Sequence, residues 1–160
     1  LHRLGSVDLE GLEKELLRHV KRRPIALVLP CLYSELEGAA VPFIVEELKK
    51  VEYIDQIVLS MVRMTLDEFK SAASFFSQLP QHSRILWHDG PEMQRLISEL
   101  DDNELSIGER GKGRGSWLAF GYVLATQRAA VIALHDCDIV SYNRELLARL
   151  CYPIANKSLG

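Results

Sequence analysis

The fold class follows from a short apolar run, Ile25-Ala26-Leu27-Val28-Leu29, which Pro30 interrupts. Five successive apolar residues predict a strand buried on both faces, because a strand with one face in water alternates apolar and polar residues. Further strands are predicted at 54–59, which is rich in β-branched residues, at 83–87, which is shorter, and at 130–134, which is again buried; segments of helical periodicity separate them. Strand and helix therefore alternate four times, which predicts an α/β fold whose mainly parallel sheet carries helices on both faces.

Helical periodicity and helix-end signals define the segments between the strands. Thr65 is predicted to cap one helix, with Glu68 at the reciprocal position, and Pro42 and Pro91 are expected in the first turn of two others. The predicted helices span 7–21, 38–51, 65–79, 92–100, 116–128 and 142–150. Because ligands of such sheets bind beyond the carboxyl ends of the strands, functional residues are expected just after each strand.

The composition indicates one domain, residues 1–160, and excludes several classes of function. With 160 residues, 48% of them hydrophobic, the chain can bury one sizeable core. A net charge of −3 excludes a broad basic surface for nucleic acid, and the basic stretch at 19–23 is expected to complement a helix end. No apolar run in the sequence is long enough to span a membrane, and we expect no signal peptide.

The three cysteines indicate the redox environment of the protein, and the two ends of the sequence indicate whether it is a fragment. Cys31, Cys137 and Cys151 are odd in number, widely spaced and without a Cys-x-x-Cys pair. This pattern argues against a disulfide framework and a zinc ribbon and favours a reducing cytoplasm. Cys31 and Cys137 end two strands that are neighbours in many such sheets, so we expect them to pack as reduced thiols. Because residue 1 is Leu and no convincing element closes the chain, we expect a fragment of a longer protein.

Two carboxylates, Asp136 and Asp138, follow the last predicted strand directly. Residues two apart in an extended segment point the same way, and two like charges held together repel unless a cation bridges them. Mg²⁺ and Mn²⁺ favour one or two carboxylates together with substrate phosphate oxygens. The pair therefore predicts a metal site; in the alternative interpretation the segment is a turn in which Asp138 or Ser141 caps the last helix. His135 is expected to be a hydrogen-bonded core residue rather than a third metal ligand.

A glycine-rich, cationic segment precedes the fifth predicted helix: Gly108-Glu109-Arg110-Gly111-Lys112-Gly113-Arg114-Gly115-Ser116. Its glycines let the backbone approach a ligand closely, and Ser116 is expected to cap a helix whose N-terminus favours an anion. Phosphate is the predicted ligand, and a solvated flexible loop is the alternative. The segment is not a P-loop, because Gly113 follows Lys112, and its glycine spacing does not fit a dinucleotide fingerprint.

A third candidate segment, 29–35, follows the first strand. Its main chain can contact a base or ribose, with Tyr33 or Glu35 adding side-chain contacts; in the alternative interpretation Ser34 only caps the next helix. Two other features are expected to be structural. The segment 88–91 is predicted to be a turn and a helix start, and three aromatic residues are expected to pack rather than bind sugar: Trp117, Phe120 and Tyr122.

Together these motifs resemble retaining glycosyltransferases of the GT-A fold, most closely the glucosyl-3-phosphoglycerate synthase and mannosylglycerate synthase groups. The matching pieces are 29–35, 111–117 and 134–139, which occur in the family's order, and the resemblance covers most of the chain from Ile25 onward. It implies that the predicted sheet is a Rossmann-like GT-A sheet and that residues 1–160 form the donor domain, lacking most of the acceptor region.

The resemblance also implies roles for individual residues, although it names no catalytic nucleophile or base. Asp136 and Asp138 would bind the metal, Mg²⁺ or Mn²⁺. The residues implied to bind the donor nucleotide are Pro30, Cys31, Leu32, Ser34, Glu35, Ser60, Gly111, Lys112 and Asp136.

The implied reaction is transfer of a hexose, with retention, from a nucleotide sugar of the UDP-glucose or GDP-mannose type to a small acceptor such as 3-phosphoglycerate or glycerate. The segment 59–63 lacks the acidic residue that many such enzymes place there, which leaves the donor base open. The expected protein is cytoplasmic, with a homodimer as one possible assembly. Two alternatives stay open: a non-catalytic nucleotide-binding module, and a nucleotidyltransferase, whose glycine-rich loop usually follows the first strand.

Overall fold

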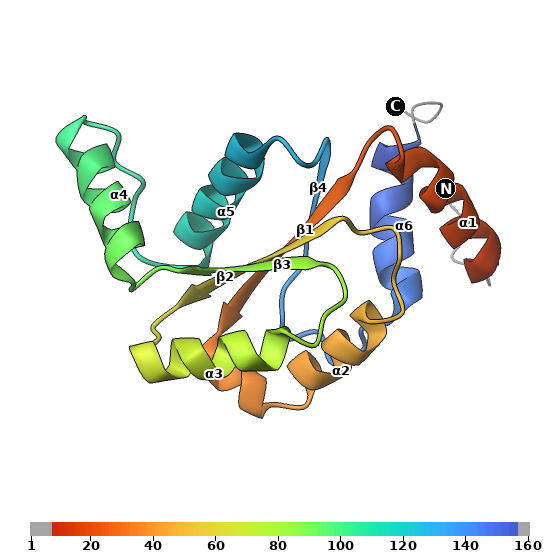
Figure 1. The fold of residues 1–160 in the computed structure, drawn as a ribbon, viewed down its shortest axis with the longest axis horizontal. Helices are drawn as coiled ribbons and strands as arrows, with labels where there is room; N and C mark the ends of the chain where they lie inside the picture. Colours follow the sequence, from red (N-terminus) through yellow and green to blue (C-terminus); the bar gives the residue numbers. More distant parts are fainter. Residues whose placement is uncertain (1–7, 157–160) are drawn as a thin grey trace.

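Four parallel strands form the centre of the computed structural model, which describes residues 8–156 (Figure 1). They lie in the order β3-β2-β1-β4, so the chain starts in the middle of the sheet and crosses back to add β4 on the other side of β1. The strands are β1 (Ile25–Leu32), β2 (Gln56–Val62), β3 (His82–Trp87) and β4 (Val131–Leu134). The predicted α/β class and parallel sheet are confirmed.

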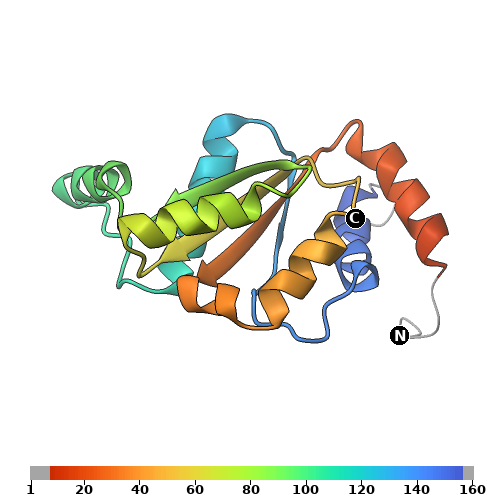
Figure 2. The same ribbon diagram turned by 60° about the horizontal axis from the view of Figure 1, so that its bottom comes forward.

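Helices cover both faces of the sheet, as predicted. In Figure 2, α2 (Ala40–Leu48) and α3 (Leu66–Phe76) lie in front of the sheet, and α5 (Lys112–Thr126) lies behind it. On the face of α2 and α3, α6 (Arg144–Ala155) completes the larger core, and α1 (Leu9–Val20) lies beside α6 (Figure 1). Alternation along β2 follows from this arrangement: Ile57 and Leu59 enter the larger core, whereas Val58 packs in the cluster beneath α5.

Pro30 lies inside β1, so the predicted end of the strand at this residue is wrong. The carbonyl of Val28 accepts a hydrogen bond from the amide of His135 at 3.4 Å, so the peptide groups of Val28 and, two residues on, of Pro30 face β4. The pairing of β4 stops at Leu134, opposite Val28. The N–H that Pro30 lacks therefore has no strand partner to lose, and β1 continues alongside β2.

Two helix starts differ from prediction. α5 begins at Lys112, four residues before the predicted cap, and the Ser116 hydroxyl instead donates to the Lys112 carbonyl at 3.0 Å. Because glycines cost helix stability but do not forbid it, half of the glycine-rich segment is the first turn of this helix. α6 is capped by the Asn143 side chain, which accepts from the Leu146 amide at 2.8 Å, and neither Asp138 nor Ser141 caps it.

The remaining boundaries mostly follow the prediction. The capping box of Thr65 and Glu68 is confirmed at α3, and Pro91 opens α4 (Pro91–Asp102). Asp8 caps α1; the predicted start of that helix at Val7 lies outside the described residues. A short 3-10 helix, η1 (Tyr33–Glu37), stands before α2, where only a possible cap was predicted. Within residues 8–156, no helix is long and apolar enough to cross a membrane.

Candidate functional site

The carboxyl-terminal edge of the sheet gathers the polar side chains that the motifs supply. Loops after all four strands reach this edge, and α5 starts there. The first backbone hydrogen bond of α5 joins the Gly115 amide to the Gly111 carbonyl at 3.0 Å, so the amides before Gly115 in its first turn are left without helical partners. These free N–H groups and the helix dipole make this edge favourable for a negatively charged ligand.

Lys112 brings three of the predicted residues together. Its Nζ lies 3.4 Å from Asp136 Oδ1, 3.8 Å from Glu35 Oε1 and 3.9 Å from Asp138 Oδ2. These contacts join the start of α5 to the segments that follow β1 and β4. We call these four residues the Lys112 cluster. The sequence placed all four at a donor site, and the structure shows that one ammonium holds them in a single group.

The cluster has more negative than positive charge, three carboxylates against one ammonium. Partial burial lowers the pKa of Lys112, but the charges of Asp136, Glu35 and Asp138 outweigh it and hold that pKa above its ordinary value. The side chains of Asp136 and Asp138 are 56% and 64% exposed. A ligand from solvent can therefore reach both carboxylates.

Glu35 is more constrained than the two aspartates. Its Oε2 accepts a hydrogen bond from the Leu32 amide at 2.7 Å, while Oε1 faces Lys112. The carboxylate thus fixes the turn into η1 and has one oxygen left for the cluster. This tie leaves Asp136 and Asp138 as the carboxylates free to bind a cation.

The donor set fits a hard divalent cation that shares its ligands with a phosphate. Asp136 and Asp138 offer carboxylate oxygens, which Mg²⁺ and Mn²⁺ prefer, together with water and phosphate oxygens. Over residues 8–156 there is no group of three or more His, Cys, Asp or Glu side chains placed to hold a metal ion. A cation at Asp136 and Asp138 would therefore complete its coordination with ligands from outside this part of the chain, such as water and phosphate oxygens.

A buried pair, Ser60 and His88, packs against the start of α5, the helix that carries Lys112. Ser60 Oγ and His88 Nε2 lie 2.8 Å apart, and each residue is only 2% exposed. A Cβ added to Gly115 would lie 2.9 Å from Ser60 Oγ, so α5 can sit this close only because residue 115 is glycine. Burial, and then the charge of Arg114, lower the pKa of His88 to about 4, so its imidazole is neutral at neutral pH.

Sequence reasoning missed His88, because the segment 88–91 was interpreted only as a turn and a helix start. Pro91 does open α4, but the preceding imidazole enters the space between β2 and α5. Asp89 is also occupied: its carboxylate accepts from the Met64 amide at 2.8 Å and pairs with Arg110 of the glycine-rich segment. His88 and Asp89 could have been identified as a pair of polar residues directly after a strand, because ligands of such sheets bind beyond the carboxyl ends of the strands.

The other residues predicted to contact the donor are not members of the Lys112 cluster. Pro30 and Cys31 are buried, so a nucleotide can meet this part of β1 only through the backbone or through half-buried Leu32. Ser34 instead lines a separate cavity of about 290 Å³, together with Arg63. Gly111 stands at the cap position of α5, next to Lys112.

The expectations for the remaining side chains have mixed outcomes. All three cysteines are free and buried, and burial raises the pKa of Cys151 to about 12, as expected for unreactive thiols. His135 is buried, with its Nδ1 3.0 Å from the Asp136 carbonyl, as expected for a hydrogen-bonded residue. Of the three aromatic residues expected to pack, Phe120 and Tyr122 do so against the cluster beneath α5, whereas Trp117 is 53% exposed and lines a cavity with Leu105 and Ile107.

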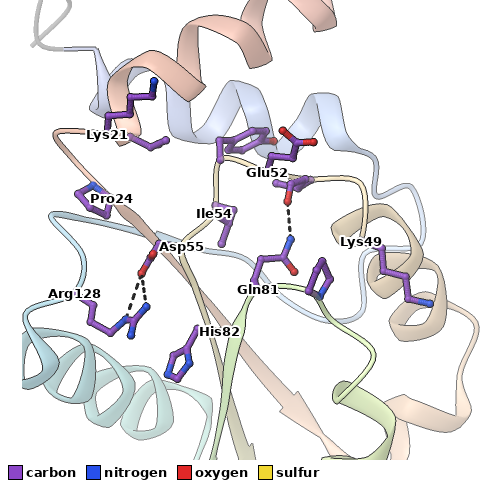
Figure 3. A pocket seen from close by; sticks show the side chains of 13 residues that line it. Lys21, Pro24, Lys49, Glu52, Ile54, Asp55, Gln81, His82 and Arg128 are labelled. Carbon is purple, nitrogen blue, oxygen red and sulfur yellow. Dashed lines mark hydrogen bonds and ion pairs between the residues drawn. The ribbon is translucent and has the colours of Figure 1, made fainter.

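A cavity of about 720 Å³ lies at the opposite, amino-terminal edge of the sheet (Figure 3). Two of its polar side chains bond within the protein: Arg128 pairs with Asp55 at 3.3 Å, and the Gln81 side-chain N–H group donates to the carbonyls of Leu48 and Val51 at 2.8 and 2.6 Å. None of the residues that the motifs single out lines this cavity.

Comparison with curated proteins finds two glucosyl-3-phosphoglycerate synthases. The relative from Persephonella marina is 49% identical over 159 residues, an alignment that covers 99% of this chain and 40% of the relative. The relative from Methanococcoides burtonii is 31% identical over 155 residues, covering 96% of this chain and 38% of the relative. The chain thus spans about two fifths of the length of these proteins. A scan against models of protein families matches none of them.

Solved structures of similar fold include glucosyl-3-phosphoglycerate synthase from Mycobacterium tuberculosis. Its complex with Mn²⁺, UDP and glucosyl-3-phosphoglycerate matches with a TM-score of 0.60 and 18% identity, over 98% of this chain and 46% of that chain. Its complex with Mn²⁺, UDP-glucose and phosphoglyceric acid matches with a TM-score of 0.59 and 19% identity, over 98% and 46%. These matches confirm the fold, and the curated relatives confirm the resemblance seen in the motifs.

Proposed function

We propose that this chain binds the donor of a metal-dependent glycosyltransferase of the glucosyl-3-phosphoglycerate synthase type. The observation that carries the proposal is the Lys112 cluster, in which one ammonium and three carboxylates meet at the carboxyl-terminal edge of a Rossmann-like sheet. The relatives give the direction of the chemistry: the Mycobacterium tuberculosis protein is seen with Mn²⁺, UDP-glucose and phosphoglyceric acid. We therefore favour UDP-glucose as donor and 3-phosphoglycerate as acceptor.

Each residue of the site has a proposed role. Asp136 and Asp138 hold Mn²⁺ or Mg²⁺, and Asp136 also contacts the ribose and the sugar. Such a cation supplies Lewis-acid stabilisation of the charge that builds up on a departing diphosphate. Lys112 and the free amides at the start of α5 add fixed positive potential toward the same phosphates.

The nucleoside is proposed to lie over the ends of β1 and β2. Leu32 is half-buried there and the backbone of Pro30 lies opposite Ser60, so these residues can border the base. Ser60 reaches the nucleoside only through its hydroxyl, since the residue is 2% exposed and bonded to His88. Cys31 contributes backbone alone, and Ser34 contributes through the neighbouring cavity that it lines.

Calorimetry of UDP, GDP and ADP, each with and without Mn²⁺, tests the donor site. We expect UDP to bind with Mn²⁺ and the Asp138→Asn variant to lose roughly a hundredfold in affinity, because it removes a charged metal ligand. The Asp55→Asn variant, changed at the opposite edge, should keep the affinity of the parent chain. UDP binding that depends on neither Mn²⁺ nor Asp138 would contradict the proposal.

The reaction itself is proposed to retain the anomeric configuration of glucose. This follows from the likeness to retaining enzymes rather than from any nucleophile in residues 8–156. The NMR coupling constant of the anomeric proton in the product from UDP-glucose and 3-phosphoglycerate distinguishes the two outcomes, and an inverted product would refute retention. We further propose a reducing, cytoplasmic location, which the three free and buried cysteines support.

A further inference from the structure

The Lys112 ammonium lies beside the two carboxylates that are proposed to bind a metal ion. Its nitrogen lies within 3.4 Å of an Asp136 oxygen and 3.9 Å of an Asp138 oxygen. A positive charge at this distance repels a divalent cation at the same oxygens and supplies part of the neutralisation that the cation would give. Lys112 and the cation are therefore competitors for one pair of carboxylates.

The charge balance of the cluster favours the divalent ion once a diphosphate is present. One ammonium leaves two of the three carboxylate charges uncompensated, whereas a divalent cation would compensate both charges of Asp136 and Asp138. A diphosphate adds further negative charge at the start of α5, where Lys112 is the first helical residue. The ammonium then has a second set of oxygens within reach of its flexible side chain.

Glu35 determines which contact Lys112 keeps. Because the Leu32 amide holds Glu35 Oε2 at 2.7 Å, this carboxylate stays in place when the aspartates turn toward a cation. Glu35 Oε1 lies 3.8 Å from Lys112 Nζ and can remain its partner during the change.

Building on the donor site proposed above, we propose that Lys112 is an exchangeable counter-ion, displaced from Asp136 and Asp138 by the divalent cation and transferred to the donor diphosphate. Metal and nucleotide then bind cooperatively, because the cation frees the ammonium and the phosphates accept it. Lys112 thereby weakens the binding of metal alone and strengthens the binding of nucleotide with metal.

Removing the charge of Lys112 should therefore change two affinities in opposite directions. Electron paramagnetic resonance of Mn²⁺ in the absence of nucleotide measures the first affinity, and calorimetry of UDP at saturating Mn²⁺ measures the second. In Lys112→Met we expect Mn²⁺ alone to bind roughly tenfold more tightly, because a competing charge within about 4 Å of the ligands is gone. The same variant should bind UDP with Mn²⁺ more weakly, and the cooperativity between Mn²⁺ and UDP should fall.

Two matched variants separate this effect from a change in net charge. Lys49→Met removes a lysine that pairs with Glu46 at 2.6 Å and lines the cavity at the opposite edge, so Mn²⁺ affinity should stay within about twofold of the parent chain. Lys112→Arg keeps the charge and should keep the weak binding of Mn²⁺ alone. Circular dichroism of each variant establishes that it is folded.

The results distinguish a failure of this inference from a failure of the donor site. If Asp138→Asn abolishes Mn²⁺-dependent UDP binding while Lys112→Met binds Mn²⁺ alone no more tightly than the parent chain, the exchange is wrong and the donor site stands. If UDP binds regardless of Mn²⁺ and of Asp138, the donor site is wrong and the exchange is refuted with it.

Discussion

The carboxyl-terminal edge of the sheet holds one ammonium among three carboxylates, whereas the amino-terminal edge holds a large cavity beside ion pairs of one cation with one anion. At the first edge Lys112 shares Asp136, Asp138 and Glu35. At the second, Arg128 and Asp55 satisfy each other beside a space of about 720 Å³. The difference teaches that excess charge near free backbone amides marks the candidate site here, and that the volume of a cavity does not.

Helix direction accounts for the lysines and arginines at the amino-terminal edge but not for Lys112 at the other edge. α1, α2 and α5 all end near the amino-terminal edge, where their last carbonyls carry partial negative charge. Lys21, Lys49 and Arg128 stand at or just after these helix ends, so each complements a helix and needs no ligand to account for it. At the other edge α5 begins, and Lys112 adds its charge to an end that is already positive.

The largest expected difference between the edges is in stability at acid pH, and it depends on His88. Its folded pKa of about 4 lies below the value of about 6.5 expected in the unfolded chain, so the unfolded state binds more protons between these pH values. The stability due to the neutral imidazole is complete above pH ~6.5 and is lost as the pH falls toward ~4. A pKa difference of this size corresponds to a contribution of about 3 kcal/mol to the free energy of unfolding.

Urea denaturation of the parent chain and of His88→Gln at pH 7 and pH 4.5 measures this contribution. We expect the variant to lose less free energy of unfolding between the two pH values, because it has no imidazole to protonate. The control is His82→Gln, which changes an exposed histidine at the amino-terminal edge. Its free energy of unfolding should decrease between the two pH values by as much as that of the parent chain. Equal pH dependence in all three proteins would show that His88 is not held neutral.

Much of the fold was predictable, because the information lies in local runs. Four predicted strands separated by helical periodicity sufficed for a parallel sheet with two covered faces. The prediction failed where distant residues decide. Pro30 continues β1 because β4 stops pairing at Leu134, a fact that the sequence around Pro30 does not contain.

The candidate site was predictable in its charged members but not in its support. Asp136, Asp138 and Lys112 belong to motifs whose residue types already indicate cation and phosphate binding. The burial of His88 depends on how closely α5 approaches β2, which no pattern in the sequence states. Likewise, the start of α5 at Lys112 rather than Ser116 required packing to outweigh the low helix propensity of glycine.

A smaller effect is expected from two glycines of α5. At Gly115 a methyl group would lie 2.9 Å from Ser60 Oγ, so Gly115→Ala should lower the free energy of unfolding by about 1–3 kcal/mol. At Gly121 a methyl group meets nothing within 4 Å, so Gly121→Ala should raise it by about 0.5–1 kcal/mol through helix propensity. Urea denaturation measures both changes, and a Gly115→Ala variant as stable as the parent chain would contradict close packing of α5 on Ser60.

The smallest expected effects compare one aspartate from each edge. Asp89 accepts from the Met64 amide and pairs with Arg110, so Asp89→Ala should cost about 1.5 kcal/mol by leaving a partly buried amide without its acceptor. Asp55 pairs only with Arg128 among the ion pairs of residues 8–156, and both side chains are more than 40% exposed, so Asp55→Ala should cost about 0.5 kcal/mol or less. Chemical denaturation at low and high salt separates the two, because added salt screens the exposed pair and leaves the Met64 hydrogen bond largely intact. Equal costs at both aspartates, equally sensitive to salt, would show that the carboxyl-terminal edge is no more tightly built than the other.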